Sequence, residues 1–342
     1  MIHNFYPGPS TLHPLFEEAI NKALETNILS FNHRSKNFHH LYQSCFELLK
    51  EKWDIPDGYE LYFISSATEA WEIISQSIIG DNPSAHFSNG AFGKKSFINT
   101  NLITGKAINH TFSLNSEPQE LKQVPRVLNF CLNETSNGSS VSSEILNEYK
   151  GKGHIICADV TSCLGGQELD LSHADIWYSS LQKCLGLPSG MAIMLVSQKA
   201  IERATEIGDN NHYNSLLKLS NNFKKFETTH TPNILDIFAL YYTQVYSDSI
   251  EITEQKLRKR KSTFMNEISF ENLIKNPSLQ SITTICLKCK FSEQLIKEAE
   301  EKNIILGKGY GEWKKDTIRI ANFPSTTNKS FDQLTNFLSS FQ

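Results

Sequence analysis

Short apolar runs alternate with helical patterns between residues 59 and 197. The apolar runs are YELYFIS, RVLNFCLN, HIICADV, IWYSS and MAIMLVS, and the segments between them include TEAWEIISQSII and SSEILNEYK, which we expect to be helices. Strands that are apolar on both faces and separated by helices are typical of a mostly parallel sheet covered by helices. The pattern predicts an α/β fold, in which ligands bind where strands end and helices begin.

The pattern changes near residue 245. A long charged helix there is followed by short strands and helices, which is typical of a small α+β unit. The expected elements are a helix over SIEITEQKLRKRKSTFMNEI, a strand at 281–289, a helix that begins at Ser292, strands in NIILGKG and TIRIANF, and a last helix with Phe331, Leu334, Leu338 and Phe341 on one face. We therefore expect a large domain at residues 15–245 and a small domain at residues 246–342, which residues 1–14 join.

Composition narrows the class of protein. The 342 residues carry a formal net charge of -4, and a binder of nucleic-acid backbones usually carries a basic surplus instead. No apolar run is long enough to span a bilayer, and the N-terminus does not resemble a secretory signal. We expect a cytoplasmic protein with no nucleic-acid or membrane partner.

Seven cysteines form an odd set in mostly apolar contexts. This usage predicts buried free thiols in a reducing compartment rather than a disulfide framework. Cys286 and Cys289 form a C-x-x-C, but they lie in an alternating strand pattern without a second ligand pair. Strand thiols are therefore a better interpretation than a metal site.

An aspartate and a lysine follow two neighbouring predicted strands. Asp159 ends HIICADV, and Lys183 comes three residues after IWYSS, so both should open on one crevice. Such a pair suits pyridoxal phosphate, because the lysine amine forms a Schiff base and the carboxylate keeps the pyridine nitrogen protonated. Either residue alone is more often a surface charge or a helix cap.

Three other strand ends carry polar or aromatic residues that fit a cofactor. In FISSATEAW a strand runs directly into a helix, whose free N–H groups favour a phosphate, although an ordinary helix cap has the same pattern. Phe92 lies in a glycine-flanked segment that we expect to be a loop, where its ring could stack on a planar cofactor or cover the core. Asn133, Glu134 and Thr135 end the strand RVLNFCLN and could contact a cofactor or form a turn.

A basic cluster stands apart from these strand ends. SFNHRSKNFHHL, residues 30–41, holds His33, Arg34, Lys36, His39 and His40. Since the whole chain is acidic, a small anion is a better ligand for this cluster than a nucleic acid.

Nine segments, in this order, resemble the class V, fold type I aminotransferases, which use pyridoxal phosphate. They are NFYPGPS, HRSKNF, SSATEAW, NGAFGKKS, LNETSNG, ADVTS, QKCLGLPSG, HTPN and IRIANFP. Within the family the sequence is most similar to enzymes that transaminate phosphoserine. The resemblance implies 3-phosphohydroxypyruvate and glutamate as substrates, in serine biosynthesis.

The resemblance also implies roles for residues around the cofactor. Lys183 would be the Schiff-base lysine, Asp159 the partner of the pyridine nitrogen, Phe92 the ring stacked on the cofactor, and Thr135 a hydrogen-bond partner. The residues expected around the cofactor phosphate are Ala67, Thr68, Ser162 and Gln182.

Substrate and subunit contacts follow from the same resemblance. Arg319 would bind the substrate carboxylate, a bidentate task that suits a guanidinium. His33 and Arg34 would approach the distal end of the substrate from a partner chain, and His230 and Thr231 would reach the cofactor phosphate of the other subunit. A homodimer with shared active sites is therefore expected.

The sequence departs from the phosphoserine enzymes at two places. Some of them carry an arginine where this chain has SSATEAW and a His-Arg pair where it has GEWKKDTIR. Lys36, Lys314 or Lys315 could supply charge instead. An alanine or serine–glyoxylate aminotransferase of class V stays an alternative; a cysteine desulfurase and a non-catalytic scaffold fit the residues less well.

Overall fold

A seven-stranded sheet forms the centre of the computed structural model, which describes residues 2–341. Its spatial order is β2 (Glu60–Ile64), β10 (Ala192–Val196), β9 (Ile176–Ser180), β8 (Ile155–Asp159), β5 (Val127–Cys131), β3 (Ser84–Ser88) and β4 (Ala107–Thr111). Only β10 runs antiparallel to its neighbours. The predicted α/β fold with a mostly parallel sheet is confirmed.

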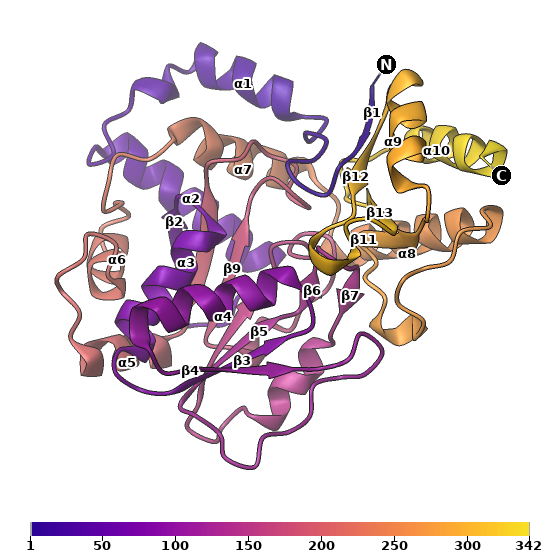
Figure 1. Cartoon of the computed structure of the whole chain (residues 1–342). Coiled ribbons are helices and arrows are strands. Elements are labelled where there is room, and N and C mark those ends of the chain that lie inside the picture. Colours follow the sequence, from indigo (N-terminus) through magenta and orange to yellow (C-terminus); the bar gives the residue numbers. More distant parts are fainter. Residues whose placement is uncertain (1, 342) are drawn as a thin grey trace.

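Helices cover both faces of this sheet (Figure 1). Because successive strand residues point to opposite faces, Ile193 and Leu195 of β10 join one core cluster and Ala192 and Met194 join the other. The first cluster includes α1 (Phe16–Glu25), α2 (Lys36–Lys52) and α7 (Ile234–Tyr246). The second includes α3 (Ala67–Ile74), α5 (Gln198–Ile207) and α6 (Leu216–Phe223), and α4 (Ala91–Thr104) packs against α3 and the outer strands.

A four-stranded sheet lies beside the large one (Figure 1). Its order is β1 (His3–Phe5), β12 (Ile304–Lys308), β13 (Thr317–Ala321) and β11 (Thr284–Lys288), and α8 (Ile250–Glu267), α9 (Ser292–Glu301) and α10 (Asn328–Ser340) belong to the same part of the chain. The N-terminal strand β1 pairs in parallel with β12. The first residues of the chain thus join a sheet built from the last part of the sequence.

Two local predictions were wrong. SSEILNEYK is not an α-helix but a short 3₁₀ helix at Ser143–Glu148, in which only Ile145 and Leu146 are buried, and two glycines with positive φ follow it. Phe92 is the second residue of α4 rather than part of a loop.

A two-stranded ribbon, β6 (Asn133–Glu134) and β7 (Ser139–Ser140), follows β5.

The seven cysteines form no disulfide bonds. Within residues 2–341 no helix has both the length and the apolar composition that crossing a membrane requires.

Candidate active site

A cavity of about 400 Å³ opens where the parallel strands end, as expected for an open α/β sheet. It lies between the large sheet and the four-stranded sheet, since Arg319 of β13 and Tyr310, between β12 and β13, line it together with residues of α3 and α4. Nine of the residues predicted from the sequence line this cavity: Ala67, Thr68, Phe92, Asn133, Thr135, Asp159, Gln182, Lys183 and Arg319.

Lys183 points into this cavity from the turn after β9. Its side chain is only 7% exposed, and its Nζ donates a hydrogen bond to Thr135 Oγ1 at 2.5 Å. Burial lowers the pKa of Lys183, while the nearby Asp159 opposes this shift. A lowered pKa increases the share of neutral amine, which is the form that attacks a carbonyl.

Gly8 leaves room for the lysine stem. Its φ is +134°, and a Cβ added there would lie 3.1 Å from Lys183 Cε. A side chain at this position would be strained and crowded. The N-terminal segment YPGPS therefore forms part of the wall, a role that the sequence reasoning had not assigned to its residues.

Asp159 ends β8 and is 8% exposed. Burial raises the pKa of its carboxyl group, although hydrogen bonds from Thr161 and the charge of Lys183 act in the opposite direction. The Thr161 backbone N–H donates to Asp159 Oδ1 at 2.9 Å. The neighbouring groups thus do not fully offset the cost of burying this charge, so the carboxylate would gain from a hydrogen bond with a cationic ring nitrogen.

The N-terminus of α3 forms another wall of the cavity. Ser66 caps this helix by accepting from the Glu69 N–H, while Ala67 and Thr68 line the cavity. Gln182 Oε1 is buried there and has no hydrogen-bond partner within residues 2–341. The free N–H groups of a helix N-terminus fit a phosphate group, and the amide N–H donors of Gln182, rather than its oxygen, could add to them.

Ser162 does not line the cavity. It is fully buried, and its Oγ bonds with Asn133 and Thr135 behind the wall. Thr161 and Ser180, which the sequence reasoning missed, line the cavity instead. The polar strand ends predicted that residues of this kind would be present, but the pattern does not determine which of two neighbours faces inward.

The ring of Phe92 lies over the lysine. Lys183 Nζ is 5.0 Å from the centroid of the ring, and Tyr310 stacks on the same ring with centroids 5.4 Å apart and an interplanar angle of 18°. Glu134, expected to contact a cofactor or form a turn, instead accepts hydrogen bonds from the Phe92 and Gly93 N–H groups at 3.1 and 3.0 Å. It therefore fixes the start of α4.

Arg319 is 4% exposed in the middle of β13. Its Nε donates to the Lys308 carbonyl at 2.7 Å and its Nη1 donates to the Thr135 carbonyl at 3.1 Å. Burial lowers the pKa of Arg319. These two bonds orient the guanidinium and leave further donors for a carboxylate.

The four residues expected to serve a partner chain do not line the cavity of their own chain. His33 is half-buried and Arg34 is exposed, and Arg34 Nε lies 3.5 Å from His33 Nε2. Burial and Arg34 lower the pKa of His33, and the charge of His230 adds to this effect. His33, Arg34 and His230 therefore lie within electrostatic range of one another, and Thr231 follows His230 in the chain.

The three lysines considered as substitutes for missing arginines, Lys36, Lys314 and Lys315, are exposed and outside the cavity. Lys95 of α4 lines it instead. This lysine lies in the segment NGAFGKKS, which carried the resemblance, but nothing in the sequence distinguished it from Lys94.

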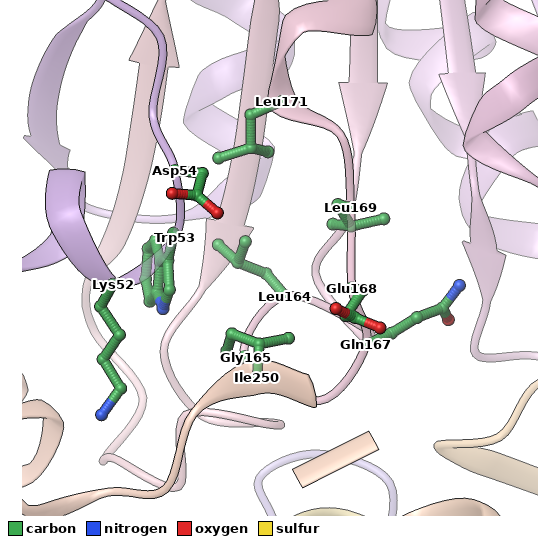
Figure 2. A pocket seen from close by; sticks show the side chains of 10 residues that line it. All are labelled: Lys52, Trp53, Asp54, Leu164, Gly165, Gln167, Glu168, Leu169, Leu171 and Ile250. Atoms are coloured by element: carbon green, nitrogen blue, oxygen red, sulfur yellow. The ribbon is translucent and has the colours of Figure 1, made fainter. Parts of the chain in front are cut away.

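A second, smaller cavity of about 90 Å³ lies between the end of α2, residues 164–171 and the start of α8 (Figure 2). Lys52 borders it, but its ammonium donates to the Gln244 and Ser247 carbonyls, both at 2.6 Å. No residue that the sequence predicted for the site lines this cavity.

Comparisons with known proteins identify the family to which the chain belongs. The family model for aminotransferase class-V matches residues 2–312. The phosphoserine aminotransferase of Rhodococcus opacus is 29% identical over 244 residues, which are 68% of this chain and 64% of that protein. The phosphoserine aminotransferase of Halalkalibacterium halodurans is 23% identical over 330 residues, which are 89% of this chain and 88% of that protein.

Solved structures show the same architecture. A crystal structure of a phosphoserine aminotransferase from Cytophaga hutchinsonii has a TM-score of 0.91 and 27% identity and covers 99% of both chains. A crystal structure of an alanine–glyoxylate aminotransferase from Nostoc has a TM-score of 0.85 and 20% identity and covers 99% of this chain and 95% of that one. The chain belongs to the class-V aminotransferases, a fold type I family that uses pyridoxal phosphate.

Proposed function

We propose that the protein transfers an amino group between phosphoserine and 2-oxoglutarate, which in the biosynthetic direction converts 3-phosphohydroxypyruvate and glutamate. One observation carries the proposal: a single cavity holds the Lys183 and Asp159 pair, the α3 N-terminus and the Arg319 guanidinium. The phosphoserine aminotransferases among its relatives support the choice of substrate.

The residues of the cavity fit pyridoxal phosphate. Lys183 would hold its aldehyde carbon, Asp159 would face its ring nitrogen, Phe92 would stack on the ring, and Ala67 and Thr68 would face its phosphate. When bound, pyridoxal phosphate accepts the amino group and withdraws electrons from the substrate α-carbon.

The chain's own residues supply binding and proton transfer. Arg319 binds the α-carboxylate of the substrate and so fixes the orientation of the α-carbon. The amine of Lys183, whose pKa burial lowers, takes the proton from the α-carbon and returns one when the second substrate reacts. Asp159 stabilises positive charge on the ring nitrogen throughout.

We also propose a homodimer with shared sites. The cavity of the same chain is lined by none of the residues His33, Arg34, His230 and Thr231, which leaves them available to a neighbouring site. In a dimer, His33 and Arg34 would approach the substrate phosphate.

The second candidate is an alanine or serine–glyoxylate aminotransferase of class V. It is supported by the segment SSATEAW, which has no arginine where some phosphoserine enzymes carry one; the Glu69 carboxylate in this segment accepts from the Ser65 N–H at 2.6 Å. A cysteine desulfurase is disfavoured because burial raises the pKa of Cys184, which opposes formation of a thiolate.

A transamination screen tests the proposal. Phosphoserine, serine and alanine are offered as amino donors, each with 2-oxoglutarate or glyoxylate as acceptor. We expect phosphoserine with 2-oxoglutarate to give the highest kcat/KM and Lys183→Ala to abolish turnover. A preference for alanine or serine with glyoxylate would establish the second candidate instead.

A further inference from the structure

Lys95 and Tyr310 meet at the open side of the cavity. Lys95 projects from α4, and Tyr310 lies between β12 and β13, 215 residues further along the chain. The Lys95 Nζ donates a hydrogen bond to the Tyr310 hydroxyl at 2.5 Å. Both side chains line the same cavity as Lys183 and Arg319.

Aromatic contacts hold the pair in place. The Tyr310 ring has Phe92 stacked at 5.4 Å and the guanidinium of Arg319 at 5.2 Å from its centroid. The Lys95 Nζ lies 5.0 Å from the centroid of Tyr310 and 5.5 Å from that of Phe92. The hydrogen bond to Tyr310 and the cation–π contact with Phe92 order the Lys95 ammonium, so less side-chain entropy is lost when a ligand binds to it.

The charge of the cavity favours a ligand with two anionic groups. Apart from Lys183, which the cofactor would occupy, two cations line it, namely Lys95 and Arg319, and the one acid, Asp159, would face the cofactor ring, among the lining residues that the structure describes. Lys95 forms no ion pair with a carboxylate anywhere in residues 2–341. Arg319 can take one anionic group, and the Lys95 ammonium remains for a second.

The hydrogen-bond pattern of the pair also suits an anion. Because the Tyr310 oxygen accepts from Lys95, its own proton is free to be donated, and the ammonium retains two further N–H donors. An oxyanion placed beside the pair would receive both an O–H and an N–H hydrogen bond. Hydrogen bonds between charged groups are among the stronger ones in proteins.

We propose that Lys95 and Tyr310 bind the side-chain anion of the substrate while Arg319 binds its α-carboxylate. The ligand is an oxyanion, either the phosphate of phosphoserine or the side-chain carboxylate of glutamate. The site rests on the proposed aminotransferase function, and it supplies from the same chain a cation that the missing arginines do not provide. His33 and Arg34 of a partner would approach the same group from the other side.

Kinetics of two variants test this site. Lys95→Met removes the ammonium and keeps the length of the side chain, and Tyr310→Phe removes the hydroxyl and keeps the stacked ring. Lys94→Met is the matched control, since Lys94 is exposed beside Lys95 but does not line the cavity. We expect Lys95→Met to lower kcat/KM by about 10- to 100-fold for donors with an anionic side chain and to lower that for alanine much less.

The pattern across donors identifies the ligand. A loss for phosphoserine alone assigns the site to the phosphate, and a loss for glutamate alone assigns it to the carboxylate. An equal loss for alanine would overturn the proposal, because the pair would then only shape the cavity. Lys95→Arg should restore part of the activity, since it restores the charge.

Equilibrium binding to the holoenzyme gives a second measurement. 3-Phosphoglycerate carries a carboxylate and a phosphate but no amino or keto group, and glycerate lacks the phosphate. We expect Lys95→Met to weaken calorimetric binding of 3-phosphoglycerate at least about tenfold and to leave glycerate unaffected. Equal binding of 3-phosphoglycerate by wild type and variant would reject the phosphate. If the wild type does not transaminate phosphoserine, the proposed function fails, while glutamate kinetics still decide the role of Lys95.

Discussion

The buried carboxylate of Glu134 holds the start of the helix that carries Phe92. Glu134 is 1% exposed, and its oxygens accept from the Phe92 and Gly93 N–H groups and from the N–H and hydroxyl of Ser136 at 2.7–3.1 Å. Gly90 makes space for it, because a Cβ added there would lie 2.2 Å from Glu134 Cγ. We therefore choose Glu134→Ala as the perturbation and Glu134→Gln as its conservative counterpart.

The expected cost follows from these bonds. Hydrogen bonds to a charged group contribute about 1.5–3 kcal/mol each, and a negative charge at a helix N-terminus adds up to about 2 kcal/mol in a partly buried site. Such contributions do not add fully, so we expect Glu134→Ala to destabilise the α4 N-terminus by about 3–5 kcal/mol, as for other broken buried networks. Glu134→Gln keeps one acceptor and should cost about 1–2 kcal/mol.

Hydrogen exchange of the apoprotein, followed by mass spectrometry, measures this cost locally. If residues 91–95 exchange through local opening, Glu134→Ala should accelerate them at least about 100-fold and Glu134→Gln about 5- to 30-fold. Peptides from β10 serve as the internal control and should be unchanged. Unaltered exchange at residues 91–95 in Glu134→Ala would refute the reasoning, since the carboxylate would then not stabilise the helix start.

Three further predictions concern the site. Arg319→Lys should raise the KM of every amino donor about tenfold or more, because an ammonium does not replace the bidentate guanidinium; a change confined to one donor would contradict this. Arg34→Ala should raise the KM of phosphoserine more than that of alanine, and equal effects would mean that Arg34 does not contact the phosphate. Asp159→Asn should stabilise the apoprotein at neutral pH while reducing turnover. Burial raises the pKa of Asp159 in the folded protein above its ordinary value of 3.8. The free energy of unfolding of the wild type therefore falls as the pH rises from the pKa of the unfolded state to that of the folded state. Denaturation at pH 3 and pH 7 should therefore show the advantage of the variant only at pH 7.

The apolar strands could be predicted because their burial leaves a continuous hydrophobic run. The two neighbouring strands β3 and β4, at one side of the sheet, escaped this reasoning, and β3 shows the physical reason. Ser84, His86 and Ser88 alternate along β3 and are buried. Ser84 lies 3.3 Å from His86, and Ser88 donates to Asn109 at 2.7 Å, while His86 Nδ1 has no partner within residues 2–341. A hydrophobicity pattern cannot represent a buried polar residue whose hydrogen bonds come from elsewhere in the fold.

Site residues could be predicted where their own local sequence shows their position relative to a strand. Lys183 and Asp159 follow strands, and that placement alone put them at one crevice. The Phe92 segment was wrongly expected to be a loop because its helix has no side-chain cap of its own; Glu134, 42 residues away, stabilises it instead. A capping group so distant leaves no local signal in the sequence.

The proposed anion sites of the cavity depend on the position of the four-stranded sheet. Arg319 and Tyr310 both belong to that sheet or its connections, while Lys95 and Lys183 belong to the large sheet and its helices. Arg260 of α8 fixes the segment after β13 by donating to Asn322 Oδ1 and to the Phe323 carbonyl, both at 2.7 Å. A shift of this sheet would therefore move the Arg319 guanidinium, which is proposed to bind the substrate α-carboxylate, and the Tyr310 hydroxyl together relative to the Lys183 amine. Such a shift would displace both binding contacts of a substrate with two anionic groups, but only one contact of a substrate with a single anionic group. Packing far from the reacting atoms would therefore contribute to the choice of substrate.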